Sequence, residues 1–434
     1  MLNIVLALCA GGCTRIPPAP PADSRVDAQL ARLIDGIRAF DDHAHPVRPV
    51  GAGEEADTLY DALPVESLEA ASDPVRMRMG AADTVAARLA LFPEGKSAAL
   101  ARHGMEHAVW VLDQLGIETM VANRVAMGPG LPASRFLWAA YADALMYPFD
   151  AAPVIHNSDQ KAFFALEEKL LQRYYYESGI AARPATLDEY LERVVRATLA
   201  RHRQGGAIAE KFEIAYLRPY DIGNPSRAEA ERAWRTLLEP RTTLNPAVRS
   251  DGASNYQALQ DYIFRFIAAE CGRLGMAVHI HTGAGSGGYF VVNGSNPLLL
   301  EPLLDDPALR QTKFVMLHGG WPFTRELTGL LTKPNAYVDF SVQGLITEPG
   351  ALAAVLRAWL EYVPEKVLFG TDAYPYSEEL GWEESGYIAA HAGRDALGIA
   401  LTGMMADGEI SRARAAELAR LVLRDNARRL YGLK

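Results

Sequence analysis

The chain has 434 residues, of which 49% are hydrophobic and 22% are charged, so it can bury a core larger than that of a small domain. Its formal net charge is −10 and it contains no basic run, which argues against a nucleic-acid partner because phosphate binding needs a basic face. No apolar run reaches the roughly 18 residues that a membrane-spanning helix requires.

The first 25 residues differ in composition from the rest. The apolar run Met1–Ala10 is followed by two glycines, by Cys13 and by a proline-rich stretch at residues 16–21. Small residues before a cysteine, with such a tether behind it, resemble a bacterial lipoprotein signal. This predicts a lipidated Cys13 and a protein of the cell envelope that touches the membrane only through that lipid. A signal peptide opens with positive charge, and none precedes Arg15, so a disordered start of a cytoplasmic protein is the alternative.

The chain has three cysteines, Cys9, Cys13 and Cys271. If Cys9 leaves with the signal and Cys13 carries lipid, no intrachain disulfide is possible. Cys271 falls inside a predicted helix, Tyr256–Leu274, and is expected to be a core thiol.

From residue 26 onward, short apolar runs alternate with longer helical patterns. Strand–helix alternation predicts a parallel sheet, and eight repeats favour a closed barrel over an open sheet. We therefore expect residues 26–434 to form one α/β domain, a (β/α)8 TIM barrel with long helical insertions. The predicted strands are Ile37–His43, Ile117–Asn123, Phe136–Ala142, Ala207–Ile214, Ala277–His281, Phe314–His318, Ala336–Phe340 and Val367–Asp372. The third of these runs also fits a helix.

Long helical patterns separate most of the predicted strands, such as Leu187–Arg203 before the fourth. Two segments, residues 46–105 and 147–200, exceed ordinary connections. We expect both to be insertions at the C-terminal ends of strands that wall a site there. The last helical run, Ser411–Leu430, has Ser411 as its predicted N-cap and is expected to pack on the barrel exterior.

The sequence DDHAHP ends the first predicted strand. Alternate side chains of a strand share a face, so Asp41, His43 and His45 should all point into the barrel. Ten histidines in 434 residues give about 0.2 His-x-His pairs by chance, and the chain has two, the other being His279/His281. Two imidazoles on one face can bind one cation, and we favour this interpretation over a pair of surface histidines.

Later strands also end in possible metal ligands. Active sites of such barrels lie at the C-terminal ends of the strands, so side chains there converge on one axis. Each residue alone is a weak indication, but together with the first strand they form one constellation. They are Lys211 on the fourth strand, His281 on the fifth, His318 on the sixth and Asp372 on the eighth.

The motifs in question are Phe40–His45, Lys211, His-Thr-Gly at 281–283, His-Gly-Gly at 318–320, Gly-Thr-Asp at 370–372 and Asn426–Tyr431. Their pattern resembles the amidohydrolase superfamily, and within it the broad amidohydrolase-related branch of metal-dependent barrel hydrolases. The resemblance covers nearly the whole chain from about residue 26. It implies that the metal ligands are His43, His45, His281 and Asp372, and that His318 and Lys211 are further members of the site.

Imidazole and carboxylate ligands suit Zn²⁺ and similar divalent ions, so we expect one or two such ions. An ion of this kind lowers the pKa of bound water from 15.7 toward about 7. Asp372 can ligate the ion and also take the proton from that water. His318 can hydrogen-bond the substrate oxygen or the leaving group, and Asp41 can orient a ligand histidine.

Lys211 has three interpretations. Carboxylation of its amine by CO₂, which the resembled family uses to bridge two metals, would complete a two-metal set. Alternatively, the amine faces a substrate carboxylate beside a single metal. In the third interpretation Lys211 pairs with Glu210 or Glu213 away from the site.

Candidates for substrate contact lie on the same rim. Two arginines suit an anionic group on the substrate, and the aromatic residues can line the cavity, although rim aromatics and arginines are common without such a role. The candidates are Tyr216, Arg218, Trp321, Arg325, Tyr374 and Tyr376.

Three other motifs are not expected to belong to a functional site. His279 is deeper in its strand and is expected to be a satisfied core histidine. His103 and His107 stand four apart in a predicted helix but lack the glutamate of a zincin motif, so we expect a solvated helix face. Residues 283–288 fit G-x-G-x-x-G, yet no helical pattern follows, so no nucleotide cofactor is expected.

The sequence therefore predicts a metal-dependent hydrolase that cleaves a C–N or C–O bond of a small and potentially carboxylated substrate. A decarboxylase on the same scaffold is the first alternative, because related barrels carry out that reaction with one metal. A non-catalytic metal-binding envelope protein is the second, and the complete ligand set argues against it. The sequence defines neither the substrate nor the oligomeric state.

Overall fold

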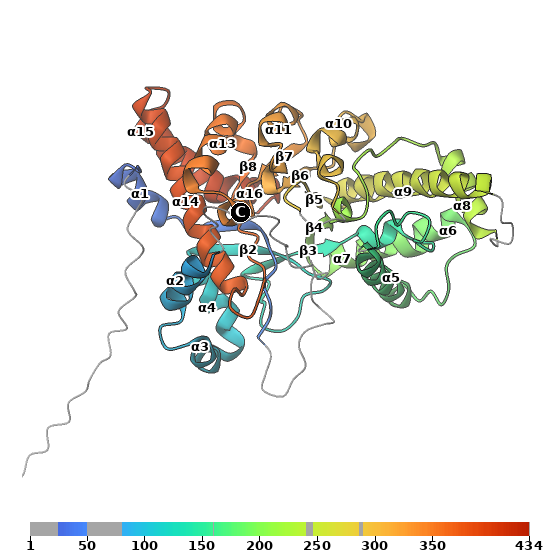
Figure 1. Ribbon diagram of the computed structural model, residues 1–434, viewed down its shortest axis with the longest axis horizontal. Coiled ribbons are helices and arrows are strands. Elements are labelled where there is room, and N and C mark those ends of the chain that lie inside the picture. The colour runs from blue at the N-terminus through green and yellow to red at the C-terminus, as the bar shows by residue number, and fades with distance from the viewer. Residues whose placement is uncertain (1–24, 50–79, 159, 240–245, 286–289, 434) are drawn as a thin grey trace, which may run out of the picture.

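The computed structural model describes residues 25–49, 80–158, 160–239, 246–285 and 290–433. At its centre lie eight parallel strands, and each pairs with the next along the chain (Figure 1). All eight predicted runs contain a strand, which confirms the (β/α)8 barrel. The strands are β1 (Ala39–Ala44), β2 (Ile117–Asn123), β3 (Phe136–Tyr141), β4 (Ala207–Phe212), β5 (Ala277–His281), β6 (Phe314–Leu317), β7 (Ala336–Asp339) and β8 (Val367–Leu368).

Backbone hydrogen bonds between β1 and the segment that follows β8 close the barrel. The amide of Asp42 donates to the carbonyl of Phe369 (2.9 Å), and the amide of Asp372 donates to the carbonyl of His43 (2.8 Å). The amide of His45 donates to Ala373 in the same way (2.8 Å). This seam brings the histidines of β1 beside Asp372, although more than 300 residues separate them in the chain.

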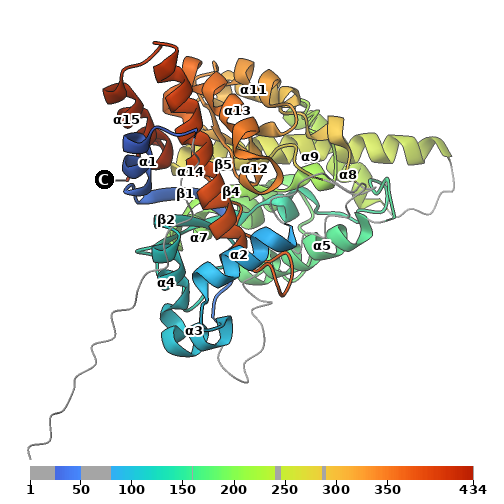
Figure 2. The same cartoon turned by 60° about the vertical axis from the view of Figure 1, so that its left-hand side comes forward.

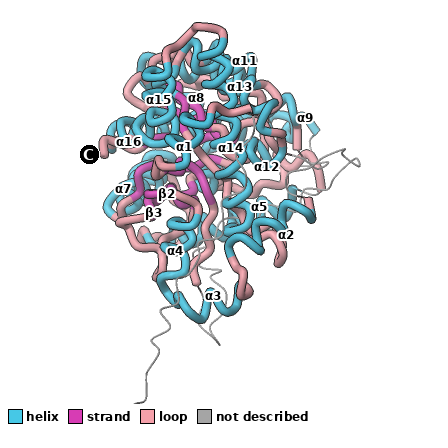
Figure 3. The backbone as a smooth tube through the Cα atoms, turned by 90° about the vertical axis from the view of Figure 1, so that its left-hand side faces the viewer, coloured by secondary structure: helices cyan, strands magenta, loops and turns pink. Residues whose placement is uncertain are grey.

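Helices surround the strands on the outside of the barrel (Figure 3). The α-helices are α1 (Ala28–Asp35), α2 (Ala81–Leu91), α3 (Lys96–His103), α4 (His107–Gln114), α5 (Gln160–Glu177), α6 (Leu187–Tyr190), α7 (Ala197–Gln204), α8 (Arg227–Leu238), α9 (Pro246–Leu274), α10 (Glu301–Leu304), α11 (Thr324–Leu330), α12 (Gln343–Ile346), α13 (Pro349–Tyr362), α14 (Trp382–Ala406), α15 (Arg412–Arg420) and α16 (Asn426–Leu430). Cys271 lies on α9 as a buried free thiol, as expected.

The end of the chain closes the N-terminal end of the barrel. Ser411 caps α15 as predicted, since its side chain accepts from the amide of Arg414. However, Leu430 of α16 belongs to the same apolar cluster as Ala277, the first residue of β5. The Tyr431 ring stacks on Phe40 at 5.8 Å. The run packs against the outer helices α1 and α14 as expected, and its last turn also covers the end opposite the site.

The predicted lipoprotein segment falls on residues that lie outside the described ranges, apart from Arg25. Within those ranges, no helix has the length and apolar character that crossing a bilayer requires.

Candidate metal centre and active site

A β-bulge at the end of β1 positions the first two histidines. The register against β2 shifts between Asp41 and Ala44, so three steps along β1 match two along β2. Asp42 faces the barrel interior, because its carboxylate accepts from the Tyr431 hydroxyl (2.5 Å), which also lies 2.7 Å from His279 Nε2. The prediction that Asp41 points into the barrel, which assumed strict alternation along the strand, is therefore wrong.

Asp41 instead holds the backbone on both sides of the barrel seam. Its Oδ1 accepts from the amide of Thr371 (2.9 Å) and from the amide of His43 (3.3 Å). Its Oδ2 accepts from the Thr371 hydroxyl (2.6 Å). Asp41 therefore fixes the main chain next to Asp372 and at His43 rather than orienting an imidazole ring.

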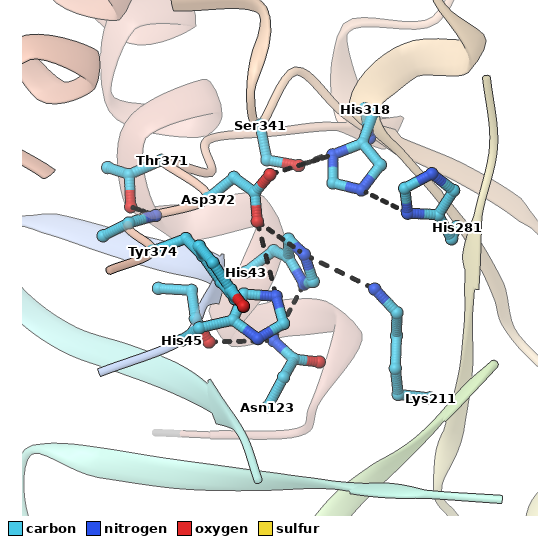
Figure 4. Close-up of polar contacts among 12 residues, drawn as sticks. His43, His45, Asn123, Lys211, His281, His318, Ser341, Thr371, Asp372 and Tyr374 are labelled. Carbon is cyan, nitrogen blue, oxygen red and sulfur yellow. Dashed lines mark hydrogen bonds and ion pairs between the residues drawn. The ribbon is translucent and has the colours of Figure 1, made fainter. Parts of the chain in front are cut away.

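His43, His45 and Asp372 converge on one point (Figure 4). The Nε2 atoms of His43 and His45 lie 3.1 Å and 3.4 Å from Asp372 Oδ1. All three side chains are buried, and the three donor atoms lie within 4.8 Å of one another. This arrangement of two imidazoles and one carboxylate can bind a divalent ion.

The other ring nitrogens of this pair are already engaged. The Asn123 side-chain amide, at the end of β2, lies 2.8 Å from His43 Nδ1 and also donates to the carbonyl of Ala44 (3.0 Å). The Tyr141 hydroxyl, at the end of β3, lies 3.3 Å from His45 Nδ1. Partners on Nδ1 orient each ring so that Nε2 faces the centre. At His43 that partner is the Asn123 amide nitrogen, a donor, so metal binding at Nε2 requires the amide to turn its unpartnered Oδ1 toward Nδ1.

A chain of hydrogen bonds on the opposite wall assigns protons to His318 and His281. When Asp339 is ionised, the Ser341 hydroxyl donates to it (2.7 Å), and the hydroxyl oxygen accepts from His318 Nδ1 (2.9 Å). His318 Nε2 then carries no proton and accepts from His281 Nδ1 (3.0 Å). His281 Nε2 is left with a free lone pair. That atom is buried without a protein partner, which fits a ligand in the cavity.

Both ring nitrogens of His318 are thus used by protein partners. A direct hydrogen bond from His318 to a substrate would require breaking its contact with His281. In this arrangement His318 orients His281 rather than facing the substrate itself.

Lys211 lies inside the same site. Its Nζ is 3.0 Å from Glu213 Oε1 and 3.5 Å from His43 Nε2. Glu213 also reaches His281 Nδ1 through its other oxygen (3.4 Å), and its amide donates to Asp143 (2.9 Å). The Lys211–Glu213 pair therefore exists, but within the site and not away from it.

Burial and charge set the protonation states that metal binding needs. Burial and the nearby Lys211 ammonium hold the pKa of His43 well below its usual value, and burial lowers the pKa of His281 to about 4. Burial works to raise the pKa of Glu213, but Lys211 and His281 outweigh it and bring the pKa to about 2. Burial likewise opposes ionisation of Asp372, yet the neighbouring imidazoles hold its pKa well below the usual range. At neutral pH His43 and His281 are therefore neutral, and Glu213 and Asp372 are ionised.

The cavity at this point has a volume of about 90 Å³. It is lined by His43, His45, Lys211, Glu213, Tyr216, His281, Ala284, His318, Val342, Asp372, Tyr374, Pro375 and Tyr376. All six predicted members of the metal site are among these residues.

Four lining residues have a strained backbone. Ala284, His318, Val342 and Asp372 are the non-glycine residues with positive φ in the described part of the chain, and each lines the cavity. Val342 is the most unusual, because a β-branched residue at φ 59° and ψ −34° forms a γ-turn, in which the amide of Gln343 donates to the carbonyl of Ser341 (2.7 Å). Such strain is concentrated at functional sites.

This strain has a measurable consequence. We expect the Val342→Gly variant to be more stable than Val342→Ala by about 1 kcal/mol, because glycine adopts positive φ without penalty. Both variants lose the valine side chain, so its burial cancels in the comparison. Urea unfolding of the two proteins measures the difference. If the alanine variant is the more stable one, as is usual at unstrained positions, the backbone is not strained there.

The predicted substrate residues divide into two groups. Tyr216, Tyr374 and Tyr376 line the cavity, and the Tyr374 ring lies 5.2 Å from the His45 ring. Arg218, Trp321 and Arg325 do not line it.

Arg218, Trp321 and Arg325 lie away from the cavity for two reasons. The Arg218 guanidinium is buried against Asp261 (2.8 Å) and Gln260 (3.2 Å), so it is not available to a substrate anion. Trp321 and Arg325 are exposed outside the cavity. Lys211 is thus the one cationic side chain among the residues that line the cavity.

The two predicted insertions do not themselves wall the cavity, since none of their described residues lines it. Segment 147–200 instead supports Tyr216: the ring of Phe163 on α5 stacks on it at 5.6 Å, and Gln160 donates to its carbonyl (3.1 Å). The first segment, of which residues 50–79 lie outside the described ranges, contacts α14 through α2 and α3.

The other histidines also have partners. His279 is hydrogen-bonded to Tyr431 as a buried core histidine, as expected. His103 stacks on Trp110 at 4.5 Å, whereas His107 is buried and lies 3.2 Å from Glu383. The expectation of a solvated face is therefore wrong for His107, because α14 covers that side of α4.

Several site residues were missed in the sequence. Glu213 follows Lys211 by two positions, and Ser341 follows Asp339 by two, so alternation could have placed each pair on one face. Asn123 is the last residue of β2, a position of the kind used for the other site residues. No sequence pattern identifies the backbone strain at Val342.

Comparison with known proteins agrees with this geometry. The family model described as Amidohydrolase matches residues 182–433, more than half of the chain. The match spans β4 to β8 with Lys211, His281, His318 and Asp372, but not the histidines of β1, whose placement rests on the structure.

One curated relative, Protein fluG of Emericella nidulans, is 27% identical over 230 residues, which are 51% of this chain but only 25% of the relative. The chain thus matches about a quarter of that protein's length.

Among solved structures, a Lactobacillus casei protein described as a metal-dependent hydrolase has a TM-score of 0.62 at 15% identity, over 93% of this chain and 97% of its own. The glucuronate isomerase of Caulobacter crescentus has a TM-score of 0.55 at 13% identity, over 94% and 96%. The uronate isomerase of Thermotoga maritima has a TM-score of 0.55 at 12% identity, over 94% and 99%. At these identities the structures share the fold alone. The family match, read together with the His-His-Asp centre, identifies the chain as a member of the amidohydrolase family and a metal-dependent, amidohydrolase-like enzyme.

Proposed function

We propose that the protein is a hydrolase that activates water at one divalent ion and cleaves a C–N or C–O bond in a small carboxylated substrate. The observation that carries the proposal is the convergence of His43 Nε2 and His45 Nε2 on Asp372 Oδ1 inside a cavity. Zn²⁺ suits these ligands. When bound, such an ion acidifies water and polarises a substrate carbonyl or ester group.

Three residues fit the ion directly, and His281 offers a fourth donor. Its Nε2 has no hydrogen-bond partner among the described residues, and His281 lines the same cavity. Asp372 has two oxygens with different surroundings: Oδ1 lies beside His43 and His45, whereas Oδ2 is 3.9 Å from His318 Nδ1. We assign Oδ2 as the atom that accepts the proton of the attacking water and returns it to the leaving group.

We propose that Lys211 stays an ammonium that binds the substrate carboxylate. A carboxylated Lys211 would be an anion beside the ionised Glu213, which lies 3.0 Å from the Lys211 nitrogen. Like charges at that distance repel strongly in a buried site. Glu213 therefore favours the single-metal interpretation over the bridged two-metal set.

The role of His318 follows from its partners. Ser341 and Asp339 fix its tautomer, and His318 in turn fixes His281. It is thus a positioning residue in this proposal, and Asp372 is the catalytic one.

The test is a screen of the metal-loaded protein against amides, esters and lactones of small carboxylic acids, beside aromatic and keto acids that a decarboxylase would use. Hydrolysis that is lost on chelation and restored by Zn²⁺ supports the proposal. Release of CO₂ from an acid without hydrolysis of any amide or ester would replace it with the decarboxylase.

A further inference from the structure

The loop between β8 and α14, residues 373–381, forms one side of the cavity. Tyr374, Pro375 and Tyr376 line it. The Tyr374 ring packs against the ring of His45 at 5.2 Å and against that of Tyr376 at 5.1 Å. The position of this loop therefore determines both the shape of the cavity and the surroundings of a metal-centre histidine.

The far side of the loop is tied to α2. The guanidinium of Arg88 donates to the carbonyls of Glu378 (2.9 Å) and Glu379 (2.8 Å). Its Nε also reaches Glu384 at the start of α14 (3.4 Å). One side chain thus links α2, the loop and α14.

The start of α14 is tied to α3 and α4. Glu383 and Glu384 are buried, at 4% and 0% exposure, and buried carboxylates need partners. Lys96 of α3 supplies one to each, at 2.7 Å and 3.1 Å, and His107 of α4 lies 3.2 Å from Glu383. Glu384 also accepts from the amide of Gly381, the last residue of the loop (3.1 Å).

Close packing accompanies these polar contacts. A Cβ at Gly381 would lie 2.5 Å from Lys96 Nζ, so the ammonium sits directly on the loop backbone. Ala87 of α2 belongs to an apolar cluster with Val342, Leu380 and Ile388. α2, the loop and the strained turn that lines the cavity therefore belong to one apolar cluster.

We infer that residues 81–114, which contain α2, α3 and α4, act as a clamp that fixes the Tyr374–Tyr376 loop over the metal centre. In Figure 2 these three helices lie together beside the end of α14. The clamp lies outside residues 182–433, the part of the chain that matches the family model. Arg88, Lys96 and His107 are then positioning residues for substrate recognition. That the clamp holds the loop does not depend on the proposed function; that the loop affects substrate binding rests on it.

Hydrogen exchange tests the clamp without any substrate. In Arg88→Met, backbone amides of residues 374–381 should exchange on the order of tenfold faster than in the wild type, with the rest of the barrel unchanged. Arg102→Met is the matched control, since Arg102 lies on α3 and, within the described part of the chain, pairs with the exposed Glu94 rather than with the loop. Arg88→Lys keeps the charge and should restore part of the protection.

Lys96→Met would remove a cationic partner from two buried carboxylates, Glu383 and Glu384, and is less suitable because it risks global unfolding. If Arg88→Met leaves exchange of residues 374–381 at the wild-type rate, or accelerates exchange equally throughout the barrel, the clamp is overturned.

A kinetic test then separates the clamp from the proposed function. With any substrate found by the screen, Arg88→Met should raise KM about tenfold at nearly constant kcat and unchanged metal content. An unchanged KM would overturn the assignment to substrate recognition, even where the loop becomes mobile. Failure to find a hydrolysed substrate would count against the proposed function and leave the exchange result standing.

Discussion

The Asp372→Asn variant is expected to keep most of its metal while kcat falls by about 10² or more, the scale of general-base loss. Asparagine preserves the size of the side chain and one ligating oxygen, but it cannot accept the proton of the attacking water. The pKa of Asp372 lies well below the usual range, so in the wild type the carboxylate is ionised wherever the enzyme is folded near neutral pH. KM should change little, because the proposed function assigns substrate binding to Lys211 and the tyrosines of the cavity.

Steady-state kinetics and metal analysis of the same preparation check this expectation. An Asp372→Asn enzyme with bound metal and near-wild-type kcat would assign the base elsewhere. Glu213 would then be the first candidate, as the other carboxylate that lines the cavity.

Replacing Lys211 by methionine is expected to lower kcat/KM for carboxylated substrates by about 10², because the substrate loses its charged partner. Metal content should stay the same if Lys211 is an ammonium. Methionine also leaves Glu213 buried without its partner, so the double variant Lys211→Met/Glu213→Gln is the control for stability. The double variant should be more stable than Lys211→Met but should not regain activity.

Mass spectrometry of the intact wild type under native conditions completes this test. The proposal predicts no added CO₂ on Lys211. A mass increase equal to one CO₂, together with loss of metal in Lys211→Met, would establish the carboxylated lysine and a bridged pair of ions instead.

The sequence predicted the barrel well because buried parallel strands leave short apolar runs between amphipathic helices. Even β3, whose run also fits a helix, is a strand where expected. The six predicted metal-site residues could be found because each lies at or shortly after the C-terminal end of a strand, and those ends meet on one axis in a barrel.

Other features could not be read from residue order. A one-residue bulge in β1 reversed the face of Asp41, and such irregularities carry no clear pattern in the sequence. Arg218 looked available to a substrate, but its partner Asp261 comes from α9, a long-range contact. The roles of Asn123 and Ser341 also depend on which neighbour each strand end meets, and the structure alone supplies that.

Metal analysis of the purified wild type and of His45→Ala tests the central claim most directly. His45 supplies one of the three donor atoms that converge at the centre. The account predicts about one equivalent of divalent metal in the wild type and little in the variant, since the ion is held by few ligands and each is essential. A wild type without metal after reconstitution with Zn²⁺, or stoichiometric metal in His45→Ala, would contradict it.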